Sequence, residues 1–280
     1  MEEIQLIESL QNPRVKNAVK LRKGNVRKQT GTTLVEGYRE LLRATESGWR
    51  FKELYICPEL FIDPGSEKLA KEIHNSGIAT FHCTKAVFQK ISYRDTPDGL
   101  MALSPLVGKK LHELELPPNP LLLIAEDLEK PGNLGTILRT ADAAGVDAVI
   151  ACDHKTDLSN PNVIRSSIGT LFFIPIAEAG SEETLDWLKQ NQIKTIAAVP
   201  RAEKEYTQVD LRGGTAIIVG AEDTGLSPFW KTQSNTQVSI PMLGRNDSLN
   251  VSTAAAIILY EAVRQRRNSV EKNRIRVNTH

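Results

Sequence analysis

The chain has 280 residues, of which 40% are hydrophobic and 25% are charged, and its formal net charge is +1. This composition is that of an ordinary globular protein with room for two domains, and no apolar run approaches the roughly 18 residues of a membrane span. The N-terminus lacks the basic start and apolar stretch of a secretion signal, and the three cysteines are too scattered for a disulfide framework or a zinc site, so we expect a cytoplasmic protein with reduced thiols.

Residues 1–106 are expected to form a small α/β unit. Their apolar residues alternate between spacings typical of short helices and spacings typical of short strands. Such alternation predicts a sheet with helices packed on it. The predicted helices span residues 12–28, 37–47, 68–75 and a turn near Val87, and the predicted strands span residues 33–36, 53–57, 79–82 and 99–103.

The first predicted helix is strongly basic. Residues 14–28 contain no acidic residue, and a second basic cluster at residues 264–276 contains the single acid Glu271. Either cluster alone is most simply a solvated helix surface, but two basic ends on a neutral body favour binding to RNA phosphates. The predicted RNA-binding residues are Arg14, Lys16, Lys20, Arg22, Lys23, Arg27 and Lys28.

Residues 107–119 are predicted to be a linker, because proline and glycine punctuate a polar stretch there. Beyond it the predicted strands are almost wholly apolar, which is typical of parallel strands buried on both faces. Helices at residues 134–144 and 182–191 have suitable lengths to connect them. The predicted strands span residues 121–125, 148–151, 171–174, 193–199 and 216–219.

Three segments place glycines and polar side chains where a predicted strand ends, which is where open α/β sheets bind ligands. The first contains Asn133, which we expect to cap a helix, and Arg139. The second contains Glu222 between two glycines. The third crowds Ser248 and Asn250 at the start of an apolar helix, although a helix cap needs only one such residue.

Taken singly, each of these segments could be an ordinary turn between a strand and a helix. The spacing of Gly132 and Gly135 does not fit the dinucleotide-binding fingerprint, which disfavours a nicotinamide-dependent oxidoreductase. No metal-ligand spacing is present, and the histidines are scattered. We therefore expect no metal.

Taken together, the three segments resemble the three motifs of the SpoU (TrmH-type) family of RNA ribose 2'-O-methyltransferases, within the SPOUT superfamily. Residues 133–145 are similar to the first motif, residues 219–226 to the second and residues 240–261 to the third, in the family's order. The N-terminal unit is similar to the small substrate-binding domain of the members that act on ribosomal RNA. That likeness lies in residues 12–16, 34–37 and 91–100.

The resemblance implies an α/β fold in which residues 120–268 form a parallel-sheet methyltransferase domain with a deep trefoil knot. It implies an RNA substrate-binding domain at residues 1–106 and leaves residues 269–280 as a basic tail. It also implies a homodimer that binds S-adenosylmethionine and RNA, without a metal or a membrane partner. The implied cofactor-binding residues are Val199, Gly220, Ile240 and Leu249, and the implied catalytic residues are Asn133, Arg139, Glu222, Ser248 and Asn250.

In the family pattern Arg139 reaches across the dimer and is the proposed activator of the 2'-hydroxyl. A free arginine stays protonated at pH 7, which disfavours a role as general base. The alternative is that Arg139 binds the adjacent phosphate and stabilises the forming alkoxide electrostatically. We expect a 2'-O-methyltransferase acting on 23S ribosomal RNA, including the possibility of a resistance-type enzyme. Two alternatives stay open: a transfer-RNA 2'-O-methyltransferase, and a catalytically idle RNA-binding or ribosome-assembly protein on the same scaffold.

Overall fold

A computed structural model describes residues 4–277 of the chain and describes side chains as far as residue 267. The chain divides into two compact units. Unit 1 consists of Met1–Val107 and Asp157–Phe173, and unit 2 consists of Gly108–Thr156 and Ile174–His280. Among the described residues, no helix is both long enough and apolar enough to cross a bilayer.

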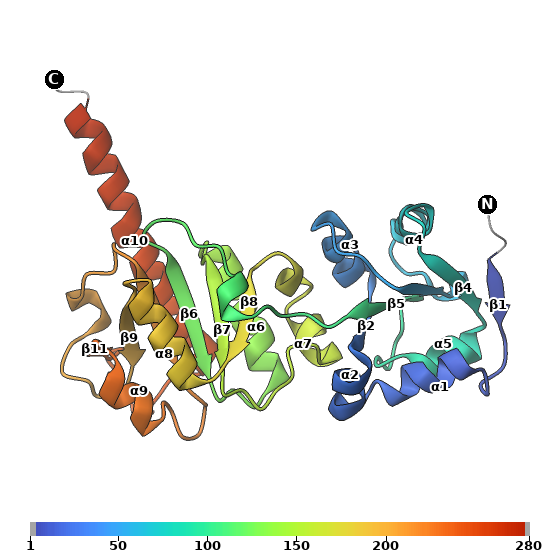
Figure 1. Ribbon diagram of the computed structural model, residues 1–280, viewed down its shortest axis with the longest axis horizontal. Helices are drawn as coiled ribbons and strands as arrows, with labels where there is room; N and C mark the ends of the chain where they lie inside the picture. Colours follow the sequence, from blue (N-terminus) through green and yellow to red (C-terminus); the bar gives the residue numbers. More distant parts are fainter. Residues whose placement is uncertain (1–3, 278–280) are drawn as a thin grey trace. The chain divides into compact units, whose positions relative to one another are not determined.

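Unit 1 is built on a five-stranded mixed sheet with the order β1-β4-β3-β5-β2 (Figure 1). Strands β1, β4 and β3 run parallel, whereas β5 is antiparallel to both of its neighbours. Strand β1 was not predicted, because it is a three-residue edge strand with only one buried side chain. The strands are β1 (Gln5–Ile7), β2 (Thr32–Glu36), β3 (Glu53–Ile56), β4 (Ala79–Cys83) and β5 (Leu100–Pro105).

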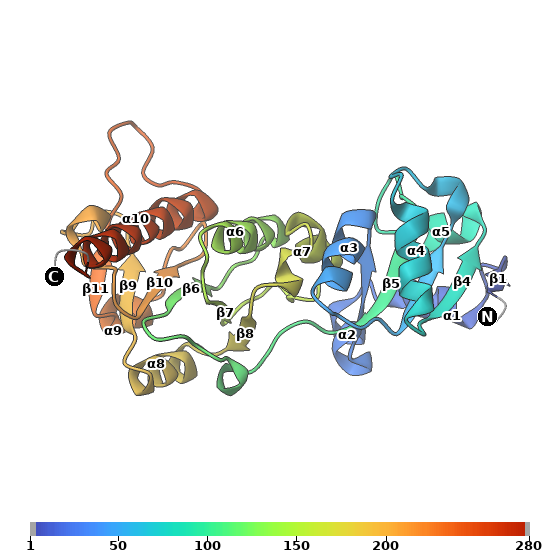
Figure 2. The same cartoon turned by 90° about the horizontal axis from the view of Figure 1, so that it is seen from above.

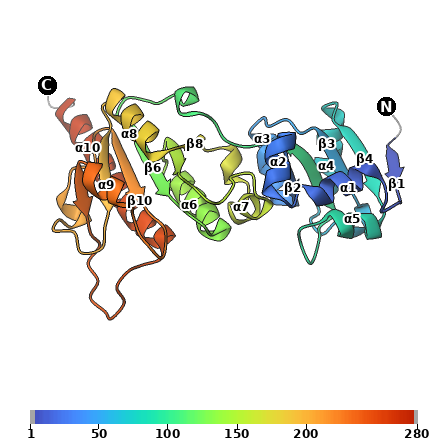
Figure 3. The ribbon, with the colours of Figure 1, turned by 60° about the horizontal axis from the view of Figure 1, so that its bottom comes forward.

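Helices cover both faces of this sheet. Helices α1 and α5 pack together on one face (Figure 3), and α3 and α4 pack together on the other. The single basic helix predicted at residues 12–28 is in fact two helices, because a turn follows Leu21. The helices are α1 (Pro13–Lys20), α2 (Gly24–Thr30), α3 (Tyr38–Glu46), η1 (Pro58–Leu60), α4 (Ser66–Asn75) and α5 (Lys85–Ile91).

Unit 1 also contains a segment from much later in the chain, Asp157–Phe173. It forms the helix α7 (Pro161–Ser166) and the 3-10 turn η3 (Thr170–Phe172). Arg43 donates to the carbonyl of Ile168 at 2.8 Å, and the Thr33 hydroxyl donates to the carbonyl of Ser159 at 2.5 Å. These bonds join the segment to α3 and β2.

Unit 2 contains a six-stranded sheet with the order β11-β9-β10-β6-β7-β8, in which every strand pair is parallel. The predicted α/β class with a parallel C-terminal sheet is confirmed. One predicted strand, at residues 171–174, is wrong: residues 171 and 172 belong to η3, and the chain enters the sheet only at β8, which begins at Ile176. The strands are β6 (Leu121–Glu126), β7 (Ala148–Cys152), β8 (Ile176–Ala179), β9 (Lys194–Ala198), β10 (Thr215–Val219) and β11 (Thr236–Val238).

Figure 2 shows α6 (Pro131–Ala143) and α10 (Val251–Val277) on one face of this sheet, with α8 (Ser181–Gln190) and α9 (Pro228–Gln233) on the other. The segment predicted as a linker contains the turn η2 (Leu111–Glu113), and its Leu111 and Leu114 are buried in the core of unit 2. A second turn, η4 (Tyr206–Gln208), lies between β9 and β10.

The basic tail predicted at residues 269–280 begins inside α10. The backbone of this helix continues to Val277, and residues 278–280 lie outside the described part of the chain.

Candidate active site

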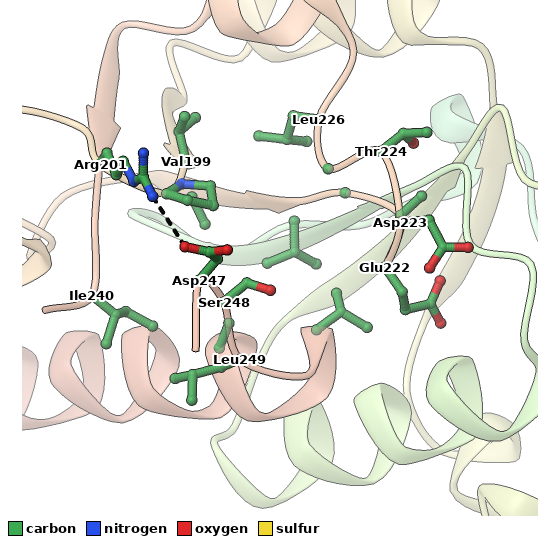
Figure 4. Close-up of a pocket in the computed structure, with 18 of the residues that line it drawn as sticks. Val199, Arg201, Glu222, Asp223, Thr224, Leu226, Ile240, Asp247, Ser248 and Leu249 are labelled. Atoms are coloured by element: carbon green, nitrogen blue, oxygen red, sulfur yellow. Dashed lines mark hydrogen bonds and ion pairs between the residues drawn. The ribbon is translucent and has the colours of Figure 1, made fainter. Parts of the chain in front are cut away.

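A cavity of about 470 Å³ lies at the carboxyl ends of β9, β10 and β11 (Figure 4). Parallel α/β sheets bind ligands at this edge, because the loops that follow neighbouring strands meet there. Four residues that the sequence singled out for a cofactor all line the cavity: Val199, Gly220, Ile240 and Leu249. The sequence therefore brings residues from three distant loops to one pocket.

Gly220 directly follows β10, at a point where the chain turns back on itself. The amide of Gly225 donates to the carbonyl of Ala221 at 2.9 Å, and Gly225 has a φ of +65°, which favours glycine. A side chain at position 220 would overlap the backbone of Gly225 and Leu226. Glycine at position 220 thus lets the loop wall of the cavity close tightly.

A chain of side-chain amides and a carboxylate joins three of the predicted catalytic residues. Asn133 donates from Nδ2 to Oε1 of Glu222, and Asn250 donates from Nδ2 to Oδ1 of Asn133 at 3.3 Å. Our expectation that Asn133 caps its helix is wrong. Helix α6 begins at Pro131, so Asn133 is the third helical residue, and its side chain is free to bridge the other two.

Asn250 also caps helix α10. Its Oδ1 accepts from the amide of Ser252 at 2.9 Å and from the Ser252 hydroxyl at 2.6 Å. This is the geometry of an N-cap one residue before the first helical residue, Val251. One amide therefore serves both the helix and the polar chain.

Ser248 and Arg139 are not part of this polar chain. Ser248 lines the cavity and is exposed, whereas Arg139 is exposed on α6 and does not line the cavity. Arg139 follows Asn133 by six residues, which turns its side chain about 120° away around an ideal helix. Within one chain, the structure does not bring Arg139 to the polar chain of Asn133, Glu222 and Asn250.

An ion pair that the sequence did not predict lies at the edge of the cavity. Arg201 donates to Asp247 at 3.0 Å, and both side chains line the pocket while remaining largely exposed (Figure 4). Arg201 lies two residues after Val199, but its φ of +63° could not be inferred from the residue type.

The cavity carries charges of both signs. Glu222, Asp223 and Asp247 supply carboxylates, and Arg201 and Lys231 supply cations. Apolar side chains make up much of the remaining wall, so the pocket suits a ligand with an apolar body and charged groups of both signs. Among the described residues, no cluster of three or more His, Cys, Asp or Glu side chains could hold a metal ion.

The residues predicted to bind RNA lie on and near α1 and α2 of unit 1. Six are exposed: Arg14, Lys16, Lys20, Arg22, Lys23 and Lys28. The prediction for Arg27 is wrong, because its side chain is only 3% exposed and pairs with Asp157 at 2.7 Å. Its guanidinium also donates to the carbonyl of Leu21 at 2.8 Å. Arg27 is thus a structural cation that ties α2 to the segment Asp157–Phe173.

Comparison with protein families gives two matches. Residues 120–260 match the SpoU rRNA Methylase family, and residues 12–102 match the MRM3-like substrate binding domain.

Individual relatives span nearly the whole chain. It is 30% identical to the 23S rRNA (guanosine(2553)-2'-O)-methyltransferase RlmP of Bacillus subtilis, over 91% of this chain and 97% of that protein. The crystal structure of an RNA 2'-O ribose methyltransferase is 40% identical with a TM-score of 0.80, over 94% of this chain and 99% of the other. An AdoMet-bound rRNA methyltransferase from Sinorhizobium meliloti is 28% identical with a TM-score of 0.85, over 93% of this chain and 98% of the other.

Proposed function

Because the chain belongs to the SpoU rRNA methylase family, we propose that it transfers a methyl group from S-adenosylmethionine to a ribose 2'-hydroxyl of 23S ribosomal RNA. The observation that carries this proposal is the cavity at the strand ends of unit 2, where the polar chain of Asn133, Glu222 and Asn250 adjoins the pocket wall. An idle scaffold would have no need to keep both the pocket and the polar chain.

The chemistry of the cavity fits S-adenosylmethionine, which the Sinorhizobium meliloti relative binds. Val199, Ile240 and Leu249 offer an apolar wall for an adenine ring. Arg201 and Asp247 offer a cation and an anion for the carboxylate and ammonium of the amino-acid portion. When bound, the cofactor supplies an electrophilic methyl group on a sulfonium.

The polar chain would position the ribose. Methyl transfer requires the accepting oxygen to be held in line with the methyl group, and positioning of this kind supplies much of the acceleration in enzymes. We assign Asn133, Ser248 and Asn250 to hydrogen bonds with the ribose and its phosphate. Glu222 fixes the amide of Asn133, because it accepts that amide's hydrogen bond.

We further propose that Arg139 acts from a second copy of the chain, in a homodimer. Its orientation on α6 supports this assignment, since Arg139 does not line the cavity of its own subunit. On α10, Tyr260 leaves half of its surface exposed beside α6, which supplies apolar area for an interface. Arg139 would then bind the phosphate next to the reacting ribose and stabilise the negative charge that develops on the 2'-oxygen.

The trefoil knot implied by the family is also part of this proposal. It is supported by the position of β10 between β9 and β6, and by the return of α10 to pack on β10 and α6 after β11. The loops that follow β10 and β11 would cross in such a knot, and both loops line the cavity.

We assign RNA binding to the N-terminal part of the chain, at residues 1–106, and methyl transfer to residues 120–268. The match of residues 12–102 to a substrate-binding domain supports the first assignment. The exposed basic residues of α1 and α2 would contact RNA phosphates, so RNA affinity should fall steeply with salt. We also propose a cytoplasmic location, because ribosomal RNA would be available there as the substrate.

Two measurements on the purified protein test this function. Isothermal titration calorimetry should detect binding of S-adenosylmethionine, and incubation with methyl-labelled cofactor and unmodified bacterial RNA should label the large ribosomal RNA. Label in transfer RNA instead would overturn the substrate assignment. Failure to bind the cofactor would favour the idle RNA-binding protein.

A further inference from the structure

Unit 1 contains a second cavity, of about 590 Å³, that the reaction described above does not use. It forms where the start of α3 meets the loop after Ile91, two segments that the sequence already singled out. Helix α7 contributes Arg165 from the later segment of the chain. A volume of this size lies within the range of small-molecule sites in proteins.

The floor of this cavity is a preorganised cluster of charged groups. Arg94 pairs with Glu40 at 3.0 Å and with Asp98 at 3.4 Å, and it donates to the carbonyl of Glu36 at 2.9 Å. A side chain at Gly37 would overlap both Arg94 and Glu40, so glycine is required for this packing. Burial raises the pKa of Glu40, partly offset by Arg94.

The rim of the cavity, which carries Arg39, Asp63, Asp95 and Arg165, differs from this floor because, among the described residues, none of these four side chains forms an ion pair. Arg39 and Arg165 are exposed. Asp95 on the same rim is also exposed, and Ile62 leaves 71% of its surface in contact with solvent. Two arginine cations, carboxylate acceptors and the apolar side chain of Ile62 thus surround the opening of the cavity.

A free anion does not suit this cavity, because the charge of Arg94 is already matched by two carboxylates. A nucleotide suits it better, since its phosphate needs the rim arginines and its base offers amino groups and a flat apolar face. Proteins read RNA mainly at unpaired nucleotides, stacking the base on aromatic or guanidinium planes and hydrogen-bonding its edges. Tyr38 lines the cavity and provides such a plane here.

We propose that the cavity of unit 1 binds one unpaired nucleotide of the RNA substrate, other than the nucleotide that is methylated. Arg39 and Arg165 contact its phosphates, and Asp95 accepts a hydrogen bond from the base. This proposal rests on the proposed function only in taking RNA as the substrate. It would make the cavity a determinant of which RNA is chosen, while the chemistry stays in unit 2.

Three variants of the full-length protein test the proposal by binding to a labelled in vitro transcript of bacterial 23S rRNA. Loss of Arg39 and Arg165 together should weaken binding about tenfold and lower the salt slope by about 1.4, because each single-strand phosphate contact contributes about 0.7. Arg50→Ala with Lys52→Ala is the matched control, since both residues are exposed in unit 1 and outside the cavity.

The third variant, Asp95→Ala, separates base contact from general charge. Removing a negative charge should strengthen non-specific binding, whereas loss of a base contact should weaken binding several-fold without changing the salt slope. Equal losses for the cavity and control doubles, or tighter binding by Asp95→Ala, would overturn the proposal. A further combination of results would also overturn the proposal. If millimolar mononucleotides bind the cavity but the cavity variants bind RNA as tightly as the wild type does, the cavity would serve free nucleotides.

Cofactor affinity, measured by calorimetry on the same variants, should be unchanged. This measurement distinguishes the present proposal from the proposed function. A wild-type protein that binds the transcript but neither binds the cofactor nor methylates RNA would contradict the enzymatic function without contradicting the nucleotide site. Photo-crosslinking with 4-thiouridine or 6-thioguanosine in the transcript gives a second measurement. Adducts should appear on the peptide that contains Tyr38, and adducts confined to unit 2 would contradict the proposal.

Discussion

Substitutions of Asn250 should separate its capping of α10 from its part in the proposed active site. The Oδ1 atom accepts two hydrogen bonds from Ser252, at 2.9 and 2.6 Å, while Nδ2 donates to Asn133 at 3.3 Å. Asn250→Asp keeps the acceptor that caps the helix and removes the donor. Asn250→Ala removes both.

The two changes should therefore differ in stability. Loss of an N-cap costs about 1 kcal/mol, which lowers the Tm of a unit of this size by about 2–4 °C. Asn250→Asp should leave the Tm unchanged or slightly raised, because a carboxylate at a helix N-terminus interacts favourably with the helix dipole. Both variants lose the bond to Asn133, so kcat should fall at least tenfold in both, since about 1.4 kcal/mol of transition-state stabilisation is worth a factor of ten.

The assays are thermal unfolding of the full-length protein, followed by circular dichroism, and single-turnover methyl transfer to rRNA. Asn250→Ser is the control, because serine can also cap the helix but cannot donate from an amide. Full activity of Asn250→Asp, or a loss of stability as large as that of Asn250→Ala, would show that the Asn250 amide does not hold these two roles.

Four further predictions follow from single residues. Gly220→Ala should abolish cofactor binding in calorimetry, because the new methyl group would overlap the loop at Gly225. Arg139→Lys should lose most of kcat with unchanged cofactor affinity, because lysine keeps the charge but not the planar fork of donors. Arg201→Ala should weaken binding of S-adenosylmethionine several-fold but not of 5'-methylthioadenosine, which lacks the amino-acid portion. Burial raises the pKa of Cys83 to about 12, so this thiol should not react with 5,5'-dithiobis(2-nitrobenzoate) at pH 8 in the folded protein.

Each of these expectations has a contrary result. Normal cofactor affinity in Gly220→Ala would mean that the loop can open, and near-normal turnover in Arg139→Lys would show that charge alone suffices. Parallel losses for both ligands in Arg201→Ala would place the arginine on the nucleoside side. For Cys83 the folded pKa lies above the unfolded value of 9.0, so the stability contributed by the protonated thiol is present below pH 9 and is lost as the pH rises toward 12. Rapid labelling at pH 8 would contradict this burial.

The parallel sheet could be predicted because its strands are buried on both faces and are therefore continuously apolar. Strand β6 is an example, with all six of its residues buried. The same signal failed at residues 171–174, because a short apolar run fits a buried turn equally well. The short strands β1 and β11 bury too few side chains to leave a pattern.

The candidate site shows a similar division. The sequence identified the three loops, because polar residues and glycines after apolar strands are locally visible. It could not reveal that Asn133 faces Glu222 and not its own helix, since that depends on two residues 89 positions apart. It likewise placed Arg27 among the exposed cations, because the partner that buries it, Asp157, lies 130 positions away.

The most direct test of the proposed reaction is the position of the transferred methyl group in the RNA. Labelled 23S rRNA can be hydrolysed in alkali, which cuts each phosphodiester through its free 2'-hydroxyl. Methylation of the 2'-oxygen blocks that cut, so the account predicts that the label is recovered in an alkali-resistant dinucleotide. Recovery of the label in mononucleotides would place the methyl group on a base and contradict the account.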